Sequence, residues 1–302
     1  MKLVTYKADN QTERLGALVE QGVMDLQEAA RSSRLSAEPF AGMVTFLSGG
    51  ESLRRQAQQL LAAAPRSKVF PLKALKLLPP VPHPGKIVAV GLNYRDHAME
   101  SGAAQAPKVP ILFAKFPNSI SGPEDPIVIP AGNPNVDWEA ELAVVIGRKG
   151  KGISAEHADE YIGGYMPLND VSAREWQFGD KQWVRGKSPD TFCPTGPYLT
   201  TLDEISDVHA LRICSRVNGT TMQDSSTSKL IFQVSQLVEF ISAAITLEPG
   251  DIVATGTPEG VGAFRKPPIY LKAGDVVEIE IERLGVLRNP VVAARTQPLA
   301  VL

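Results

Sequence analysis

Two glutamates lie two residues apart in an otherwise apolar segment, VDWEAELAVVIG at residues 136–147. In a β-strand, side chains at i and i+2 project from the same face, so Glu139 and Glu141 would point together. Ala143 and Val145 continue that face with apolar residues, and the opposite face is apolar too. Buried carboxylates are costly unless their pKa values rise or a cation binds them. The segment therefore suggests a cation site.

A second glutamate-rich segment, DVVEIEIERLG at residues 275–285, provides a contrast. Its glutamates alternate strictly with Val277, Ile279 and Ile281. Such alternation is typical of a strand with one face in solvent, so we expect Glu278, Glu280 and Glu282 to be solvated.

Asp170 offers a third oxygen ligand because it follows the apolar run YIGGYMPLN, where a strand should end and a loop begin. Three carboxylates without a paired His or Cys favour a hard divalent ion, Mg²⁺ or Mn²⁺ before Zn²⁺. An aspartate at a strand end can equally cap the turn that follows it. The residues alone leave both roles for Asp170 open.

His97 and Glu100 lie three residues apart in GLNYRDHAME, where we expect a short helix near 94–101. That spacing puts both side chains on one helix face, so the carboxylate could orient the imidazole for proton transfer. The alternative is an incidental pair on an exposed helix. The following segment, SGAAQAPKVP, has the composition of a mobile loop and could act as a lid.

The segment at residues 169–197 gathers several further polar residues. Its GKS at 186–188 does not make a P-loop, because the glycine required five residues earlier is Lys181. Arg174 and Gln177 follow Asp170 at helical spacing and could hold a carboxylate. We expect the other Arg and Lys side chains of this segment to lie at the surface.

The segment ATGTPEGVG at residues 254–262 follows an apolar run and is rich in glycine. Its backbone could approach an anionic ligand closely, with Thr257 adding a hydroxyl group. A plain tight turn explains the glycines equally well.

The composition excludes several classes of partner. The chain has 302 residues and a formal net charge of −2, so nothing favours nucleic acid or an anionic membrane surface. Cys193 and Cys214 are too few for a disulfide framework and lack the spacing of a zinc site. The N-terminus MKLVTYKADN is unlike a signal peptide, and no apolar run approaches the ~18 residues of a membrane span. We expect a soluble, cytoplasmic protein that acts on a small molecule.

Three regions follow from the distribution of strands, helices and prolines. Residues 1–64 read as a small unit of two strands and two helices, and residues 65–85 as a proline-rich linker. Residues 86–302 contain many short β-rich runs separated by Gly and Pro. Helical patterns interrupt these runs only near 94–101, 154–160 and 233–246. This density predicts a mostly antiparallel barrel or roll.

Taken together, these segments resemble the fumarylacetoacetate hydrolase family, and within it the shorter members with acylpyruvase or decarboxylase activity. The resemblance runs from about Lys86 to the C-terminus, and residues 1–64 are similar to a small N-terminal domain of some members. It implies an α+β, mostly β fold: a mixed β-roll or barrel preceded by a small α/β domain. The matching segments, in order, are KIVAVGLNYRDHAMESG, PILFAKFPNSISGP, VDWEAELAVVIG, GYMPLNDVSAREWQ, GKSPDTFCPTGP and DIVATGTPEGVG.

The resemblance also implies roles for individual residues. It implies that Mg²⁺ (or Mn²⁺) is held by Glu139, Glu141 and Asp170. It implies that His97 and Glu100 activate the catalytic water while the following loop closes over the substrate. Lys187 would contact the substrate, Arg174, Gln177 and Thr257 would complete the pocket, and the protein would be a homodimer.

The expected activity is metal-dependent hydrolysis of the C–C bond of an acylpyruvate or related β-diketo acid, giving pyruvate and a carboxylic acid. Retention of both His97 and Glu100 favours hydrolysis. The alternatives are an oxaloacetate decarboxylase, or an isomerase or hydratase of a 2-oxo acid from aromatic catabolism. A protein that binds such a ligand without turning it over is a further alternative, since a fold does not determine the reaction.

Overall fold

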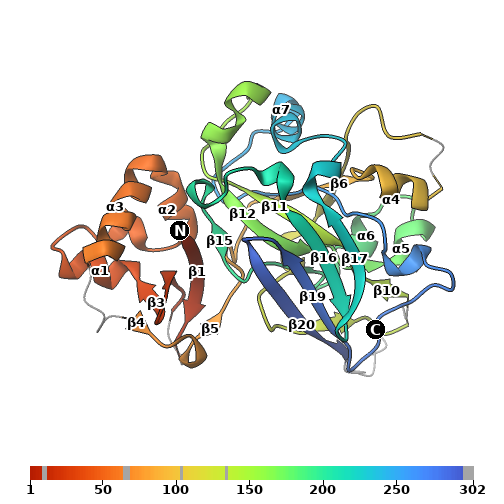
Figure 1. Cartoon of the computed structure of the whole chain (residues 1–302), viewed down its shortest axis with the longest axis horizontal. Helices are drawn as coiled ribbons and strands as arrows, with labels where there is room; N and C mark the ends of the chain where they lie inside the picture. The colour runs from red at the N-terminus through yellow and green to blue at the C-terminus, as the bar shows by residue number, and fades with distance from the viewer. Residues whose placement is uncertain (9–11, 64–68, 103–104, 133–134, 295–302) are drawn as a thin grey trace, which may run out of the picture.

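The computed structural model of the protein describes residues 1–8, 12–63, 69–102, 105–132 and 135–294. A unit of small strands and three helices lies beside a larger body built mainly of strands (Figure 1). The unit comprises β1 (Lys2–Lys7), β2 (Arg14–Val19), β3 (Gly22–Asp25), β4 (Val69–Phe70), β5 (Lys76–Leu77), α1 (Leu26–Ser32), α2 (Met43–Ser48) and α3 (Gly50–Ala63).

The N-terminal strands continue into the main sheet, because β1 pairs antiparallel with β15 (Leu199–Thr200). Two strands come from the segment that the sequence suggests as a linker: β4 pairs with β3, and β5 pairs with β1. The chain after residue 64 therefore returns to the N-terminal sheet before it enters the larger body. A domain boundary at this point stays a prediction.

The main sheet has the strand order β4-β3-β2-β1-β15-β12-β11-β18-β6-β7 within the described residues. A second sheet has the order β17-β16-β19-β20-β9 and packs against β11 and β12. The strands not yet given are β6 (Ile87–Gly91), β7 (Ile111–Lys115), β9 (Ile127–Ile129), β11 (Ala140–Ile146), β12 (Ile162–Asn169), β16 (Arg212–Val217), β17 (Thr220–Ser226), β18 (Ile252–Ala254), β19 (Val276–Ile281) and β20 (Gly285–Ala293).

Most strand pairs are antiparallel, as the short, closely spaced strands predict. Parallel pairs join β18 to β6 and β20 to β9. Two short pairs complete the strands: β8 (Ile120–Ser121) with β14 (Cys193–Pro194), and β10 (Val136–Asp137) with β13 (Ser172–Ala173). The predicted mostly β, mixed fold is confirmed.

Strand β11 is buried on both faces, which confirms the prediction from its sequence. Leu142, Val144 and Ile146 pack into the core shared with the second sheet. Ala143 and Val145 pack into the core under the N-terminal helices. In β19, by contrast, Val277, Ile279 and Ile281 are buried and the glutamates between them are partly exposed.

The three predicted helical segments are present as α4 (Arg95–Glu100), a 3₁₀ helix η5 (Ala155–Tyr161) and α7 (Val234–Ala244). The prediction that helices are confined to these segments is wrong, because α5 (Arg174–Gly179) and α6 (Val184–Lys187) also form. Gly186 lets α6 approach α5, since a Cβ there would lie 2.6 Å from the backbone nitrogen of Gln177. Both helices lie near α4 in Figure 1.

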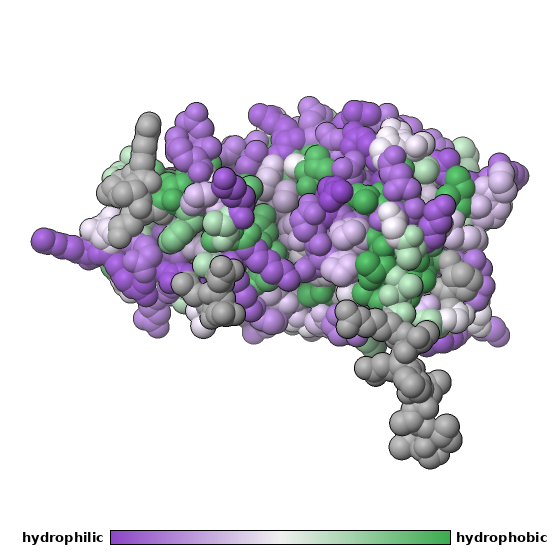
Figure 2. Space-filling view, turned by 90° about the horizontal axis from the view of Figure 1, so that it is seen from below, coloured by the Kyte–Doolittle hydropathy of each residue, from purple (hydrophilic) through white to green (hydrophobic). Residues whose placement is uncertain are grey.

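The surface seen in Figure 2 is largely hydrophilic, with smaller hydrophobic areas between the polar side chains. Among the helices that the structure describes, none combines the length and apolar content needed to cross a bilayer.

Candidate active site

The β11–β12 pairing brings two of the predicted metal ligands together. Ala140 pairs with Asn169 at the end of the ladder, so Glu139 and Asp170 face each other just beyond it. The backbone N–H of Asp170 donates to the carbonyl of Glu139 at 2.9 Å, and the N–H of Glu139 donates to Oδ1 of Asn169 at 3.0 Å. Glu141 follows within β11. The strand register thus positions this end of the site.

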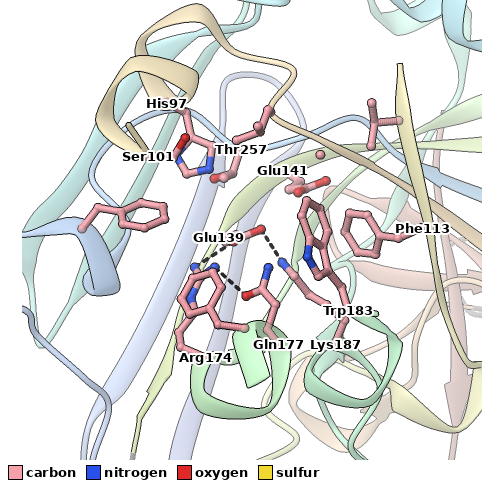
Figure 3. Close-up of a pocket in the computed structure, with 15 residues that line it drawn as sticks. His97, Ser101, Phe113, Glu139, Glu141, Arg174, Gln177, Trp183, Lys187 and Thr257 are labelled. Carbon is pink, nitrogen blue, oxygen red and sulfur yellow. Dashed lines mark hydrogen bonds and ion pairs between the residues drawn. The ribbon is translucent and has the colours of Figure 1, made fainter. Parts of the chain in front are cut away.

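The three predicted carboxylate ligands converge. Glu139, Glu141 and Asp170 each place one oxygen within 4.8 Å of the others, and all three residues are buried. Glu139 and Glu141 both point into the pocket of Figure 3. Three oxygen donors at this spacing match the ligands that a small hard cation prefers.

Two lysines lie among these carboxylates. Lys187 Nζ lies 2.8 Å from Oε2 of Glu139 and 2.7 Å from Oδ2 of Asp170. Lys115 Nζ lies 2.6 Å from Oδ1 of Asp170 and also donates to the backbone carbonyl of Lys187. Both lysines are buried, so the surface position expected for Lys187 from the residues alone is wrong. Helix α6 folds back over the site and carries Lys187 inside.

Sequence reasoning did not single out Lys115. The available signal was its place at the end of the apolar strand ILFAK, where a lysine closes a run that otherwise reads as buried. Its partner Asp170 lies 55 residues away along the chain, so the pairing itself has no local signature.

Arg174 and Gln177 lie together, as their spacing predicts. Arg174 pairs through Nε with Oδ1 of Asp137 at 2.6 Å and through its terminal nitrogen with Oε1 of Glu139 at 2.7 Å. It also donates to Oε1 of Gln177 at 3.0 Å. Asp137, which sequence reasoning missed, additionally accepts the N–H of Ala263 at 2.8 Å. Asp137 and Glu139 therefore both hold the guanidinium of Arg174, and Figure 3 shows its ion pair with Glu139.

Carboxylates outnumber cations in this cluster. Within the described residues, the cluster contains four buried carboxylates and three buried cations: Asp137, Glu139, Glu141 and Asp170 against Lys115, Lys187 and Arg174. Burial raises the pKa of Glu139, but the charges of Lys187 and Arg174 outweigh it and lower that pKa to about 2.

Glu141 differs from Glu139 in its surroundings. It accepts a hydrogen bond from the backbone N–H of Gly256 at 2.8 Å. Burial, followed by the charges of Asp170 and Glu139, raises the pKa of Glu141 well above its usual value. A divalent cation beside Glu141 would supply the missing positive charge. The residues present thus fit a metal site made of oxygen ligands.

His97 and Glu100 form a pair at the pocket in which the histidine is buried and the glutamate is partly exposed, rather than a fully exposed pair on a helix. Nδ1 of His97 lies 3.2 Å from Oε2 of Glu100, and the histidine is 5% exposed and lines the pocket. Glu100 also accepts the backbone N–H of Gly260 at 3.0 and 3.1 Å. Of the proposed lid, residues 103–104 lie outside the described residues; Ser101, at its start, lines the pocket.

The glycine-rich segment 254–262 binds carboxylates of the protein itself. Gly256 donates to Glu141 and Gly260 donates to Glu100, so one loop holds a predicted metal ligand and the predicted base pair. Both glycines have positive φ, +100° and +99°, which other residues adopt only with strain. The two interpretations of this segment from the sequence therefore both apply in part. The segment forms a turn, and its backbone N–H groups bind carboxylates of the protein itself.

Thr257 is held by a glutamine that sequence reasoning missed. Its Oγ1 accepts a hydrogen bond from Nε2 of Gln223 at 2.7 Å, while Oε1 of Gln223 accepts the N–H of Ala140 at 3.0 Å. Gln223 therefore links the Thr257 loop to the start of β11.

Several of these residues line a cavity of about 220 Å³. One part of the lining is polar: His97, Glu139, Glu141, Arg174, Gln177, Lys187 and Thr257. The other part is largely apolar and includes Val90, Leu92, Phe113, Phe178, Trp183 and Phe264. Trp183 and Phe113 lie together beside Lys187 in Figure 3. The cavity suits a small molecule with one charged and one apolar part.

The two cysteines are buried and unpaired, in agreement with their sequence interpretation as small packing residues. Burial raises the pKa of the Cys193 thiol to about 12. Cys193 is therefore a thiol at neutral pH and not a nucleophile.

Comparison with known proteins finds relatives that cover most of this chain. One relative of this chain is the mitochondrial oxaloacetate tautomerase FAHD2A of Bos taurus, which is 49% identical over 252 residues, or 83% of this chain and 79% of the relative. Another is the mitochondrial oxaloacetate tautomerase fahd2 of Xenopus laevis, which is 45% identical over 295 residues, or 97% of this chain and 90% of the relative. A solved structure of maleylpyruvate hydrolase from Sphingobium sp. SYK-6, in complex with manganese (II) ion and pyruvate, is 31% identical with a TM-score of 0.80, covering 98% of this chain and all of that one.

One expectation from the sequence is overturned by these relatives. Both are named as mitochondrial, and this contradicts the expected cytoplasmic location. The cytoplasmic location was expected because the cysteines are free and the N-terminus is unlike a signal peptide. These features distinguish a reducing compartment from an oxidising one, but they do not distinguish one reducing compartment from another.

The family comparison covers most of the larger body of the molecule. The model that describes the fumarylacetoacetate (FAA) hydrolase C-terminal domain matches residues 86–292, a range that includes the three carboxylates, both lysines and the His97–Glu100 pair. The chain therefore belongs to the fumarylacetoacetate hydrolase family.

Proposed function

We propose that this protein is a metal-dependent isomerase of a small 2-oxo acid, and that its reaction is the keto–enol tautomerisation of oxaloacetate. The relatives at 45% and 49% identity are named for this reaction. It is an isomerisation, like the isomerase alternative weighed from the sequence, although that alternative concerned a 2-oxo acid from aromatic catabolism. The observation that carries the proposal is one cavity lined by a buried histidine, which pairs with Glu100, and by two buried carboxylates, Glu139 and Glu141, that converge with Asp170.

The polar part of the cavity would bind the 2-oxo acid head. Lys187 would donate a hydrogen bond to the 2-oxo oxygen, where negative charge develops as a proton leaves C3. Arg174 and Gln177 would bind a carboxylate of the substrate, and Thr257 would complete this side. A hard divalent cation, magnesium or manganese, would be held by Glu139, Glu141 and Asp170 and would polarise the 2-oxo group when bound.

His97 would move the proton. Its imidazole faces the cavity while Glu100 holds Nδ1, so Nε2 is the atom available to take the proton from C3. The carboxylate of Glu100 would stabilise the imidazolium that forms. Return of a proton to the substrate oxygen completes the enol, and the overall reaction consumes no water.

Hydrolysis of an acylpyruvate is the second candidate function. It is favoured by the likeness to a maleylpyruvate hydrolase and by the same His97–Glu100 pair, which could activate water instead of deprotonating C3. Decarboxylation of oxaloacetate would use the same charge stabilisation without a base. The homodimer expected from the family resemblance stays a prediction.

One assay separates these reactions. Purified protein with Mg²⁺ is mixed with oxaloacetate, and enol absorbance, pyruvate and acid equivalents are followed together. A tautomerase accelerates the approach to keto–enol equilibrium without producing pyruvate. Pyruvate from oxaloacetate would indicate decarboxylation instead, and turnover of an acylpyruvate without any effect on oxaloacetate would replace the proposal with the hydrolase.

A further inference from the structure

Four aromatic side chains form the apolar side of the cavity, and we name Phe113, Phe178, Trp183 and Phe264 the aromatic wall. They form two ring contacts: Phe113 with Trp183, edge-on with centroids 5.2 Å apart, and Phe178 with Phe264, tilted with centroids 6.4 Å apart. Phe178 and Trp183 lie five residues apart, at α5 and at the start of α6, whereas Phe113 and Phe264 come from distant parts of the chain. The fold therefore brings rings from three regions of the sequence to this side of the cavity.

The position of Trp183 depends on a glycine in the neighbouring strand. A Cβ at Gly91, the last residue of β6, would lie 2.6 Å from Cζ3 of the Trp183 ring. The absence of a side chain at Gly91 thus lets the indole lie against the end of β6. Phe113 in β7 supports the ring edge-on, so the indole is held on two sides.

The cations of the lining contact the aromatic wall at two rings: Nζ of Lys187 lies 5.2 Å from the ring centroid of Phe113, and Cζ of Arg174 lies 5.9 Å from that of Phe264. Among the described lining residues, the Arg and Lys cations are Arg174 and Lys187, and both already pair with buried carboxylates. The aromatic wall offers ring faces and edges but no further cation of this kind. A substituent that meets the wall gains most if it is uncharged and flat, because rings stack or meet edge-on with other rings.

We propose that this site also tautomerises 2-oxo acids that carry an aryl group on C3, with the aryl group against the aromatic wall. This inference rests on the proposed function, since it places the 2-oxo acid head at Lys187 and the carboxylates. In the reaction, the C3–H bond breaks, the C2=O bond becomes C2–OH and a C2=C3 double bond forms. The proton that leaves C3 is balanced by one added to the oxygen, so no co-reactant is required.

Trp183 is the residue that sets this selectivity. Its ring lies beside Lys187 in Figure 3, where a group attached next to the 2-oxo acid head would reach. Trp183→Ala removes the ring but retains the backbone carbonyl that accepts the N–H of Lys187 at 3.0 Å. The variant therefore tests the wall with least disturbance of α6.

The experiment compares phenylpyruvate with oxaloacetate as substrates of the full-length protein with Mg²⁺. Wild type should accelerate enol formation from both. Trp183→Ala should lower the ratio of kcat/KM for phenylpyruvate to that for oxaloacetate about tenfold, which corresponds to about 1.4 kcal/mol. Trp183→Phe should retain most of the ratio because it keeps a ring. Phe116→Ala, which removes a 55% exposed ring outside the cavity lining, is the control and should leave the ratio unchanged.

The outcomes separate this inference from the proposed function. Activity with oxaloacetate but none with phenylpyruvate would overturn the inference alone. Activity with neither substrate would overturn the proposed function and the inference with it. Equal activity ratios in wild type and Trp183→Ala would show that the wall does not bind the aryl group. If Trp183→Ala is recovered poorly, Trp183→Leu replaces it, and calorimetry measures the affinity for phenylpyruvate. Weaker binding to Trp183→Leu than to wild type supports the inference, and equal binding contradicts it.

Discussion

The ammonium group of Lys187 lies 2.7 Å from Oδ2 of Asp170, and both side chains are buried. The second oxygen of Asp170 pairs with Lys115 at 2.6 Å. A residue predicted to bind a divalent cation is thus already paired with two ammonium groups. Glu141, in contrast, has a backbone N–H as its hydrogen-bond partner and a raised pKa, so among the three predicted ligands it is the one whose charge is least compensated by neighbouring cations.

Glu141→Gln should weaken metal binding and relieve charge repulsion at the same time. The amide oxygen can still accept the Gly256 N–H, while the charge next to Asp170 and Glu139 is removed. We expect the affinity for Mg²⁺ or Mn²⁺ to fall by about 100-fold or more, and the melting temperature without metal to stay equal or rise. Calorimetric titration and thermal unfolding measure the two effects. Wild-type metal affinity in the variant would remove Glu141 from the ligand set.

Lys115→Met should destabilise the protein, because Asp170 would lose one of its two buried partners. Removing one member of a buried ion pair costs about 3–5 kcal/mol. Urea unfolding in the absence of metal measures this cost. Lys181→Met, at an exposed position in the same region, is the matched control and should change little. Equal stability of the two variants would contradict the structural role of Lys115.

His97→Asn should abolish proton transfer and leave the metal site intact. Its side chain lies outside the carboxylate cluster and contacts Glu100 and the ring of Phe264. Loss of a general base lowers kcat by about 10²–10⁴-fold. We expect unchanged metal affinity and melting temperature beside that loss. Retention of wild-type kcat would exclude His97 as the base.

Gly260→Ala should impair catalysis through the orientation of Glu100. A Cβ at this position would lie 2.3 Å from the carbonyl oxygen of Met222, so the loop must shift and its N–H must leave Glu100. Gly274→Ala is a matched control because Gly274 has a similar φ of +95° and open space around it. Both substitutions should cost stability through backbone strain. Only Gly260→Ala should also lower kcat, and a similar loss in the control would argue against this role.

His209 should make stability depend on pH. Its Nε2 accepts the backbone N–H of Val234 at the start of α7 at 3.2 Å, so the neutral imidazole is favoured. Burial lowers the pKa of His209 below its usual 6.5, and the nearby Asp207 and Asp159 oppose this only in part.

Since the folded pKa lies below the unfolded one, the stabilisation is full above pH 6.5 and decreases as the pH falls below it. The melting temperature of wild type minus that of His209→Ala should therefore be larger at pH 8 than at pH 5.5. An equal or opposite difference would contradict the assigned direction.

Features of the site that depend on residues close in sequence could be predicted, whereas contacts between segments far apart in sequence could not. The burial of β11 and the position of Asp170 after β12 could be predicted, since alternation and strand ends are local patterns. The His97–Glu100 spacing likewise predicted a helical pair. The Lys115–Asp170 pair could not be predicted, because it depends on where β7 and the β12 end meet in the folded chain.

Two other features also required the structure. Lys187 lies inside because α6 packs closely on α5 through Gly186, and a charged residue in a polar segment gave no sign of this. Gly256 and Gly260 were recognised as turn residues, but their hydrogen bonds to Glu141 and Glu100 depend on three segments that are distant in sequence.

The most direct test of the proposed reaction is exchange of the C3 protons of oxaloacetate in D₂O, followed by NMR with Mg²⁺ and catalytic amounts of protein. We predict exchange well above the buffer rate for wild type, and exchange at the buffer rate for both His97→Asn and Glu141→Ala. Exchange at the buffer rate with wild-type protein that binds the metal would contradict the proposed tautomerisation.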